Sequence, residues 1–68
     1  MSKFSERLKE LREEKNLTIK ELSQELGVSD VAVGRWERGD RVPSIESLEL
    51  LVRFFGVTAG YLIGTEDY

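Results

Sequence analysis

Apolar residues recur along this chain at intervals of three and four positions, the spacing that gathers them on one face of an α-helix. No segment shows the alternation of apolar and polar residues that marks a strand bounded by hairpin turns. The pattern therefore predicts an all-α fold of five helices. We expect these helices from Lys3 to Lys15, Ile19 to Leu26, Asp30 to Arg38, Ile45 to Phe55 and Ala59 to Ile63.

Glycine and hydroxyl residues mark the limits of these helices. A glycine readily adopts the left-handed conformation that closes a helix, and one follows each of the last four predicted helices: Gly27, Gly39, Gly56 and Gly64. A residue whose side chain can accept a hydrogen bond from the free amides of a first turn precedes each of the same helices: Thr18, Ser29, Ser44 and Thr58. Thr18 and Glu21 also fit a capping box, so the second helix has the best-marked start.

The apolar faces of the helices predict the hydrophobic core. Its expected members are Phe4, Leu8, Leu11, Ile19, Leu22, Leu26, Val33, Trp36, Ile45, Leu48, Leu51, Val52 and Phe55. The fourth helix carries two further apolar residues, Leu50 and Phe54, which are four positions apart and point away from that face. This apolar surplus requires a partner surface.

Only Gly27, Val28 and Ser29 separate the second and third helices, too few residues for a relaxed antiparallel return. The two helices must cross steeply, as in a helix-turn-helix motif, which presents its second helix at the surface. In the third helix, Val33 and Trp36 form the inward side. The outward side carries a stripe with spacing i, i+3, i+4 and i+7: Val31, Gly34, Arg35 and Arg38.

This stripe has two interpretations. An arginine can form two hydrogen bonds with the O6 and N7 atoms of guanine, and Val31 or Ala32 can contact a thymine methyl group, so the third helix could read bases in a major groove. The plainer interpretation is a solvated helix face with one exposed valine. The third helix alone does not decide between the two.

Composition narrows the classes of function. A chain of 68 residues forms one domain, residues 1–68, and its lack of cysteine and histidine excludes disulfides and thiolate or imidazole metal sites. Its glutamates lie beside lysines and arginines at the spacing of a solvated helix surface, so we expect no enzyme, no cofactor and no small-molecule substrate. No apolar run is long enough to span a membrane and no secretory signal is visible, so we expect a cytoplasmic protein.

The net charge of −3 opposes DNA binding, because lysine and arginine supply much of the affinity for phosphates. The distribution of the charge weakens that objection. Residues 1–44 carry equal numbers of basic and acidic side chains, and the whole acidic excess lies in residues 45–68. A local basic strip can bind DNA even when the far side of the domain is acidic.

Seven short segments stand in a characteristic order: 7–12 (RLKELR), 17–22 (LTIKEL), 26–29 (LGVS), 36–39 (WERG), 43–44 (PS), 56–58 (GVT) and 61–64 (YLIG). Together they resemble the phage repressor and Cro-like family of helix-turn-helix regulators. The resemblance covers nearly the whole chain. It implies a compact five-helix, lambda-repressor-like DNA-binding domain in which the second and third helices form the helix-turn-helix.

The resemblance also implies roles for individual residues. It places the third helix in the major groove, with Arg35 as the principal base-reading residue. The expected DNA-binding residues, which contact bases or phosphates, are Thr18, Lys20, Ser29, Asp30, Val31, Ala32, Arg35, Arg38, Arg41 and Ser44. Among them, Thr18 and Ser44 mark helix starts whose amides are expected to bind phosphates. Arg12 and Glu37 are implied to form an internal ion pair, so its loss should reduce stability first.

Three residues depart from the family pattern. Ile19 stands where many members have glutamine, and it cannot donate a hydrogen bond to a phosphate. Asp30 can accept a hydrogen bond from a cytosine N4 amine or simply favour the helix dipole, and we favour the dipole. Gly34 removes a side chain from the outward stripe. It either permits close approach to the DNA backbone or has no role there.

The family usually reads inverted repeats as dimers, so the resemblance implies a homodimeric repressor that binds double-stranded DNA in a sequence-specific way. The candidates for a self-complementary dimer contact are Leu50, Phe54, Tyr61 and Ile63. Alternatively, the fifth helix and residues 65–68 cover these side chains within one chain. The alternative function is a protein-binding module on the same scaffold, antitoxin-like or antirepressor-like, which the acidic balance and the three departures support.

Overall fold

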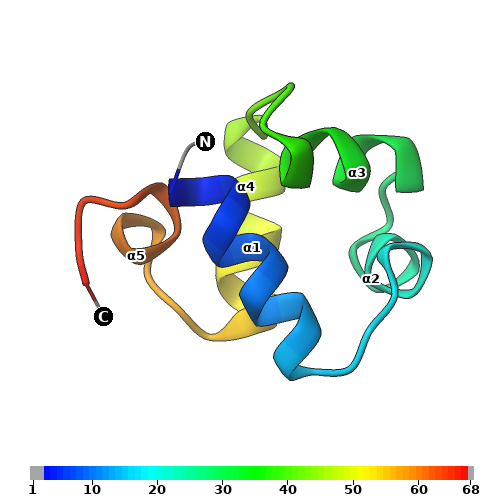
Figure 1. The fold of residues 1–68 in the computed structure, drawn as a ribbon, viewed down its shortest axis with the longest axis horizontal. Coiled ribbons are helices and arrows are strands. Elements are labelled where there is room, and N and C mark those ends of the chain that lie inside the picture. Colours follow the sequence, from blue (N-terminus) through cyan, green and yellow to red (C-terminus); the bar gives the residue numbers. More distant parts are fainter. Residues whose placement is uncertain (1–2, 68) are drawn as a thin grey trace.

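The computed structural model describes residues 3–67 and contains five helices (Figure 1). They are α1 (Lys3–Glu14), α2 (Ile19–Leu26), α3 (Asp30–Arg38), α4 (Ile45–Phe55) and α5 (Ala59–Ile63). The predicted all-α class is confirmed, and four of the helices have the predicted limits. The first ends one residue before the prediction, and Asn16 beyond it has a left-handed backbone with φ of 56°. None of the helices within residues 3–67 is long and apolar enough to cross a membrane.

The predicted caps are confirmed at the starts of α2 to α5. At each start, a serine or threonine side chain accepts a hydrogen bond from the backbone amide three residues later. At α2 the capping box is complete: the Glu21 amide donates to the Thr18 hydroxyl over 3.0 Å, and the Thr18 amide donates to the Glu21 carboxylate over 2.8 Å. Local sequence therefore sets where these helices begin.

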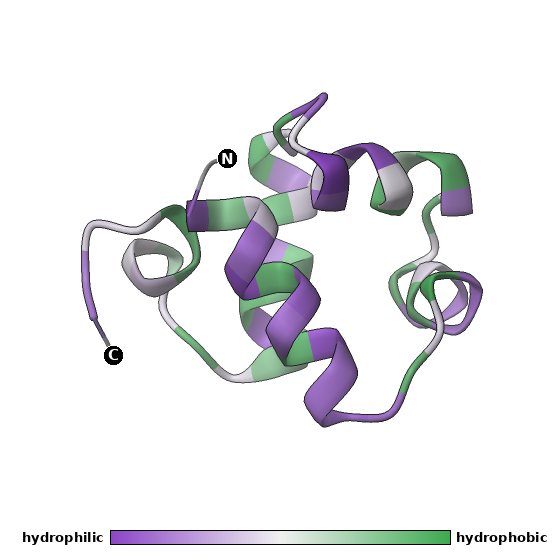
Figure 2. Cartoon of the chain, in the orientation of Figure 1, coloured by the Kyte–Doolittle hydropathy of each residue, from purple (hydrophilic) through white to green (hydrophobic). Residues whose placement is uncertain are grey.

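The hydrophobic core lies where the helices meet. Its buried apolar side chains are Phe4, Leu8, Leu22, Leu26, Val33, Trp36, Leu51 and Leu62. Figure 2 shows α1 with hydrophilic positions (purple) toward the viewer and hydrophobic stretches of α4 (green) behind it. Most of the predicted core is confirmed, either in this buried set or packed half-buried against it. Leu62 is a core residue that the prediction left out.

The prediction for Ile45 is wrong. Its side chain is 73% exposed on the first turn of α4 instead of buried. Of the two surplus apolar residues on this helix, Leu50 is exposed, but Phe54 is half-buried with its ring edge-on to that of Phe55, 5.0 Å between ring centres. The Lys15 ammonium group lies 5.4 Å from the centre of the Phe54 ring. Phe54 thus already has neighbours within the chain.

Arg7 fixes the C-terminal segment against α1 and α5. Its guanidinium lies 4.3 Å from the centre of the Tyr61 ring and donates hydrogen bonds to the backbone carbonyls of Tyr61 and Glu66. It also forms an ion pair with Asp67 over 3.6 Å. Leu50 remains exposed with the segment in this place. Tyr68, the last residue of the predicted cover, lies outside the described residues. In Figure 1 this end of the chain runs past α5, on the side of the domain away from α3.

Candidate nucleic-acid interface

The corner between α2 and α3 has the geometry of a helix-turn-helix. Gly27 adopts a φ of 73°, which the absence of a side chain permits, and the Val28 amide donates back to the Ser23 carbonyl over 3.0 Å. The chain then enters α3 through the N-cap residue Ser29. As a result, Val33 and Trp36 are buried in the core while Arg35 is exposed. The predicted orientation of α3 is confirmed.

A groove of about 650 Å³ runs between the start of α2 and the outer side of α3. Its lining contains half of the predicted DNA-binding residues: Thr18, Lys20, Asp30, Val31 and Arg38. Arg12, Ile19 and Gly34 complete the lining. We call this the α2–α3 groove.

The first turn of α2 borders the α2–α3 groove and carries two free backbone amides. The capping box occupies the amides of Thr18 and Glu21, but within residues 3–67 the amides of Ile19 and Lys20 have no hydrogen-bond partner. Free amides at the positive end of a helix dipole form a binding site for a phosphate group. The main chain at Ile19 therefore keeps the donor that its side chain lacks.

A second groove, of about 200 Å³, lies on the other side of α3 and is lined by Ala32, Arg35, Trp36, Arg41 and Val42. We call it the α3–loop groove. The exposed side of α3 thus forms a ridge between the two grooves. Within residues 3–67, neither Arg35 nor Arg41 has an ion-pair partner. The sequence analysis did not include Val42, whose side chain is 79% exposed, among the site residues. The only sign of it in the sequence is an apolar residue between an arginine and a proline in a short loop.

Arg38 and Gly34 are arranged differently from the predicted stripe. Gly34 is buried rather than exposed, and a Cβ atom at this position would stand 3.2 Å from Nη1 of Arg38. The reason is that α3 packs against both α1 and α2, so its buried arc is wider than one stripe. Arg38 itself forms an exposed ion pair with Asp40 over 3.1 Å. Its charge is therefore partly balanced within the chain.

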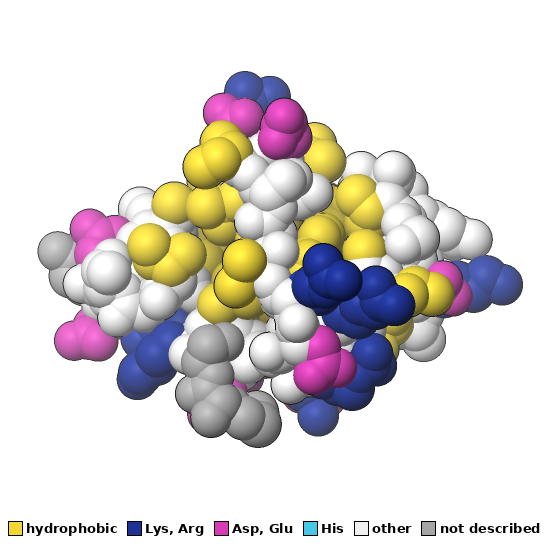
Figure 3. All heavy atoms as spheres, turned by 90° about the horizontal axis from the view of Figure 1, so that it is seen from above, with side chains coloured by type: hydrophobic (Ala, Val, Ile, Leu, Met, Phe, Trp, Pro, Cys, Tyr) yellow, Lys and Arg dark blue, Asp and Glu magenta, His cyan; other side chains and the backbone are white. Residues whose placement is uncertain are grey.

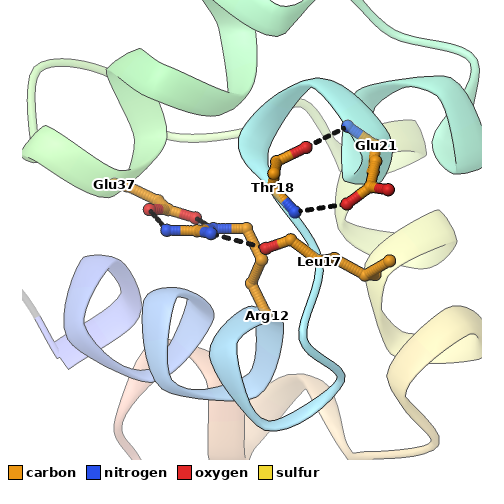
Figure 4. A network of polar contacts seen from close by, with 5 residues as sticks. All are labelled: Arg12, Leu17, Thr18, Glu21 and Glu37. Carbon is orange, nitrogen blue, oxygen red and sulfur yellow. Dashed lines mark hydrogen bonds and ion pairs between the residues drawn. The ribbon is translucent and has the colours of Figure 1, made fainter.

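Arg12 and Glu37 form an enclosed ion pair between α1 and α3 (Figure 4). Two nitrogen atoms of the guanidinium donate to the two carboxylate oxygens, over 2.6 and 3.0 Å. A third donates to the Leu17 carbonyl over 2.7 Å, at the entry to α2. Only 12% and 6% of the two side chains are exposed, and the hydrogen bonds with Glu37 raise the pKa of Arg12 above its ordinary value. The pair fixes α3 relative to the start of α2.

The remaining predicted residues lie at helix starts. Ser29 accepts a hydrogen bond from the Ala32 amide over 3.1 Å, and Ser44 accepts one from the Ser47 amide over 3.1 Å. Neither Ser29 nor Ser44 lines either groove, whereas the other eight predicted DNA-binding residues line one of the two. Figure 3 shows lysine and arginine side chains gathered on the surface seen from above, with an acidic side chain and hydrophobic side chains beside them.

Comparison with known proteins gives consistent matches. The model of the helix-turn-helix family HTH_3 matches residues 8–62. Over 64 residues the chain is 42% identical to the HTH-type transcriptional activator BcrR of Enterococcus faecalis, covering 94% of this chain and 31% of BcrR. It is 30% identical over 64 residues to the cryptic phage CTXphi transcriptional repressor RstR of Vibrio cholerae, covering 94% of this chain and 58% of RstR. The chain thus spans less than two thirds of either relative.

Among solved structures, the fold is similar to that of the P22 c2 repressor in complex with a synthetic operator. The TM-score is 0.86 with 28% sequence identity, and the match covers 93% of this chain and 96% of the other. This likeness confirms the lambda-repressor-like fold class.

Proposed function

This chain belongs to the HTH_3 helix-turn-helix family, and from that premise we propose that it is a transcriptional regulator that binds double-stranded DNA through α3. The observation that carries the proposal is the exposed guanidinium of Arg35 on the ridge between two grooves, which has no ion-pair partner within residues 3–67. A helix ridge flanked by grooves fits a DNA major groove, with the phosphate backbones on either side. The relative in complex with its operator supports this mode of binding.

In this proposal the two grooves divide the contacts. The α2–α3 groove binds one phosphate backbone through the amides of Ile19 and Lys20 and the side chain of Lys20. Arg35 donates two hydrogen bonds to guanine on the ridge, where Val31 contacts thymine methyl groups. Arg41 binds phosphate from the wall of the α3–loop groove. Arg38 contributes less, because Asp40 shares its charge.

We further propose that the chain reads an inverted repeat as a homodimer and acts as a repressor. Two relatives named as repressors, RstR and P22 c2, support this role, whereas BcrR is named as an activator. A reporter gene downstream of the selected site should lose expression when the protein is produced. A gain of expression would instead assign the chain to activation.

The DNA-binding proposal is tested by selecting bound duplexes from a random pool and then comparing two variants on the selected site. Arg35→Ala should lower affinity about tenfold or more and flatten the preference over a scrambled duplex, because a bidentate guanine contact contributes about 1 to 3 kcal/mol of discrimination. Lys9→Ala, an exposed cation on α1, should change neither. Failure of the wild type to bind any duplex at low salt would favour a protein-binding module instead.

A further inference from the structure

An apolar groove on α4 lies apart from the two grooves that flank α3. It has a volume of about 350 Å³ and is lined by Ile45, Leu48, Glu49, Val52, Arg53 and Ala59. Ile45, the residue expected in the core, is one of the most exposed large apolar side chains in the described chain. This surface, which we call the α4 groove, is on a different face of the helix from Leu50. An exposed apolar surface rimmed by charges is typical of an interface with another protein.

The opposite charges of Glu49 and Arg53 on the rim of the α4 groove favour a second copy of this chain as its partner. Glu49 and Arg53 stand one helical turn apart, and within residues 3–67 neither has an ion-pair partner. When two such helices pack antiparallel around a two-fold axis, the Glu49 of each copy faces the Arg53 of the other. The surface is therefore complementary to itself, as a dimer with two-fold symmetry requires.

The shape of the α4 groove fits the same arrangement. The protruding Ile45 stands at one end of α4, and at the other end, where Gly56 closes the helix, the small residue Ala59 lines the groove. A Cβ atom built on Gly56 would have no neighbour within 4 Å, so this end is open. In an antiparallel pair, the Ile45 of one copy lies over the open end of the other.

We propose that two copies of this chain associate through the α4 groove, with antiparallel α4 helices and reciprocal contacts between Glu49 and Arg53. The inference deepens the proposed dimeric reading of an inverted repeat and rests on it. It moves the dimer contact from Leu50, Phe54, Tyr61 and Ile63 to the opposite charges and apolar side chains of one groove. Phe54 and Tyr61 already pack against neighbours within the chain.

The location of the α4 groove suits a dimer that binds DNA. The groove begins at Ile45, directly after the loop that carries Arg41 and Val42. The α4 groove shares no lining residue with the two grooves beside α3, so joining two copies here leaves both of those grooves uncovered by the paired α4 residues.

The first test is sedimentation equilibrium of the free protein over micromolar to millimolar concentrations. Ile45→Glu should raise the dimer dissociation constant at least about tenfold, a loss of about 1.4 kcal/mol. The matched control Leu50→Glu places the same charge on an exposed position of the same helix and should leave the constant unchanged. Both positions are exposed, so both variants should fold, which circular dichroism verifies. A wild type that stays monomeric, or a dimer broken by Leu50→Glu alone, overturns the inference.

The second test uses the reciprocal charges. Glu49→Arg alone and Arg53→Glu alone should each weaken the dimer, because each places like charges opposite one another twice. An equimolar mixture of the two variants should restore dimers, since every contact in the mixed pair again joins opposite charges. No rearrangement within a single chain can produce that rescue, and its absence refutes the antiparallel pairing.

A half-site duplex separates failure of this inference from failure of DNA binding. If the α4 groove forms the dimer, Ile45→Glu should bind a single half-site as tightly as the wild type does and lose only the added affinity of the full inverted repeat. If the half-site itself is not bound by the wild type, the proposed DNA-binding function fails, whatever the sedimentation result.

Discussion

At the scale of single residues, two ion pairs of similar chemistry should contribute differently to stability, because only one of them is enclosed. Arg12 and Glu37 are almost fully covered and meet through two hydrogen bonds, whereas Arg38 and Asp40 are both more than 60% exposed. Water screens the exposed pair, but an enclosed charge that loses its partner remains without solvent. Since the pKa of Arg12 is raised, its contribution to stability is fully present below the unfolded-state pKa and disappears only as the pH rises through the folded-state pKa. Acidic and neutral pH therefore leave Arg12 charged.

Removal of the acidic partner should lower the free energy of unfolding much more for the enclosed pair than for the exposed pair. Glu37→Ala should lower the free energy of unfolding by about 3 kcal/mol, because it leaves the Arg12 guanidinium covered and unpaired. Asp40→Ala, the matched control, should cost less than about 1 kcal/mol. Urea denaturation followed by circular dichroism measures both. Equal losses would contradict the structural role of the enclosed pair.

Two glycines should respond in opposite directions to the same substitution. Gly34 is in the middle of α3, and a methyl group there meets only the flexible end of Arg38, so Gly34→Ala should raise the free energy of unfolding by about 0.5 to 1 kcal/mol. Gly64 has a φ of 94°, and a methyl group there would stand 2.5 Å from the Cβ atom of Lys3, so Gly64→Ala should lower it by at least about 1 kcal/mol. Thermal and urea unfolding of both variants provide the comparison. A loss of stability in Gly34→Ala would show that Arg38 cannot move aside.

At the scale of the helices, capping explains why the sequence predicts their limits so closely. A residue such as Ser29 or Thr58 supplies a hydrogen bond that only a helix start can use. A glycine such as Gly27 supplies a conformation that only a helix end needs. These signals are local, so they can be read from the chain without knowledge of its packing.

The cap of α2 should contribute measurably to stability. Thr18→Ala should lower the free energy of unfolding by about 1 kcal/mol, because the Glu21 amide loses its acceptor. Thr18→Ser keeps a hydroxyl group in the same place and should retain most of that stability. The comparison is made by urea denaturation. If the two variants are equally destabilised, the methyl group of Thr18 matters rather than its hydrogen bond.

The positions that sequence reasoning misjudged depend on neighbours that are distant in the chain. Periodicity shows which residues share a face of α4, but not how far along that face other helices reach, so Ile45 was placed in the core. Gly34 was placed on an outer stripe because periodicity assumes one buried side, whereas α3 packs against two helices. Val42 lies in a loop without periodicity, and its place beside Arg35 and Trp36 of α3 follows only from the fold.

At the scale of the whole molecule, the net charge disfavours DNA binding, whereas the local charge around α3 favours it. The chain carries −3 overall, yet the surface around α3 offers Lys20, Arg35 and Arg41 without ion-pair partners within residues 3–67. Glu37 does not offset them, because Arg12 already balances it inside the domain. Affinity for phosphates depends on this local surface, while the overall charge reduces the attraction at long range.

Removing one negative charge at two different places distinguishes these effects. Asp40→Asn frees Arg38 and should tighten binding to the selected duplex several-fold. The logarithm of the affinity should also fall more steeply with the logarithm of the salt concentration, by the amount of about one added phosphate contact. Glu14→Gln changes the net charge by the same amount on α1, far in sequence from α3, and should have little effect. Fluorescence anisotropy over a range of salt concentrations measures both. Equal gains in affinity would show that the overall field, not the local surface, controls binding.

The anchoring of the C-terminal segment by Arg7 determines how this domain can be joined to other proteins. Because residues 65–67 are held past α5, a fluorescent label or a second protein joined at Asp67 starts from the side of the domain away from α3 (Figure 1). Such a fusion leaves the surface proposed to face the duplex unobstructed even with a short linker. An attachment in the loop at residues 39–44 would instead stand beside Arg35, on that proposed surface.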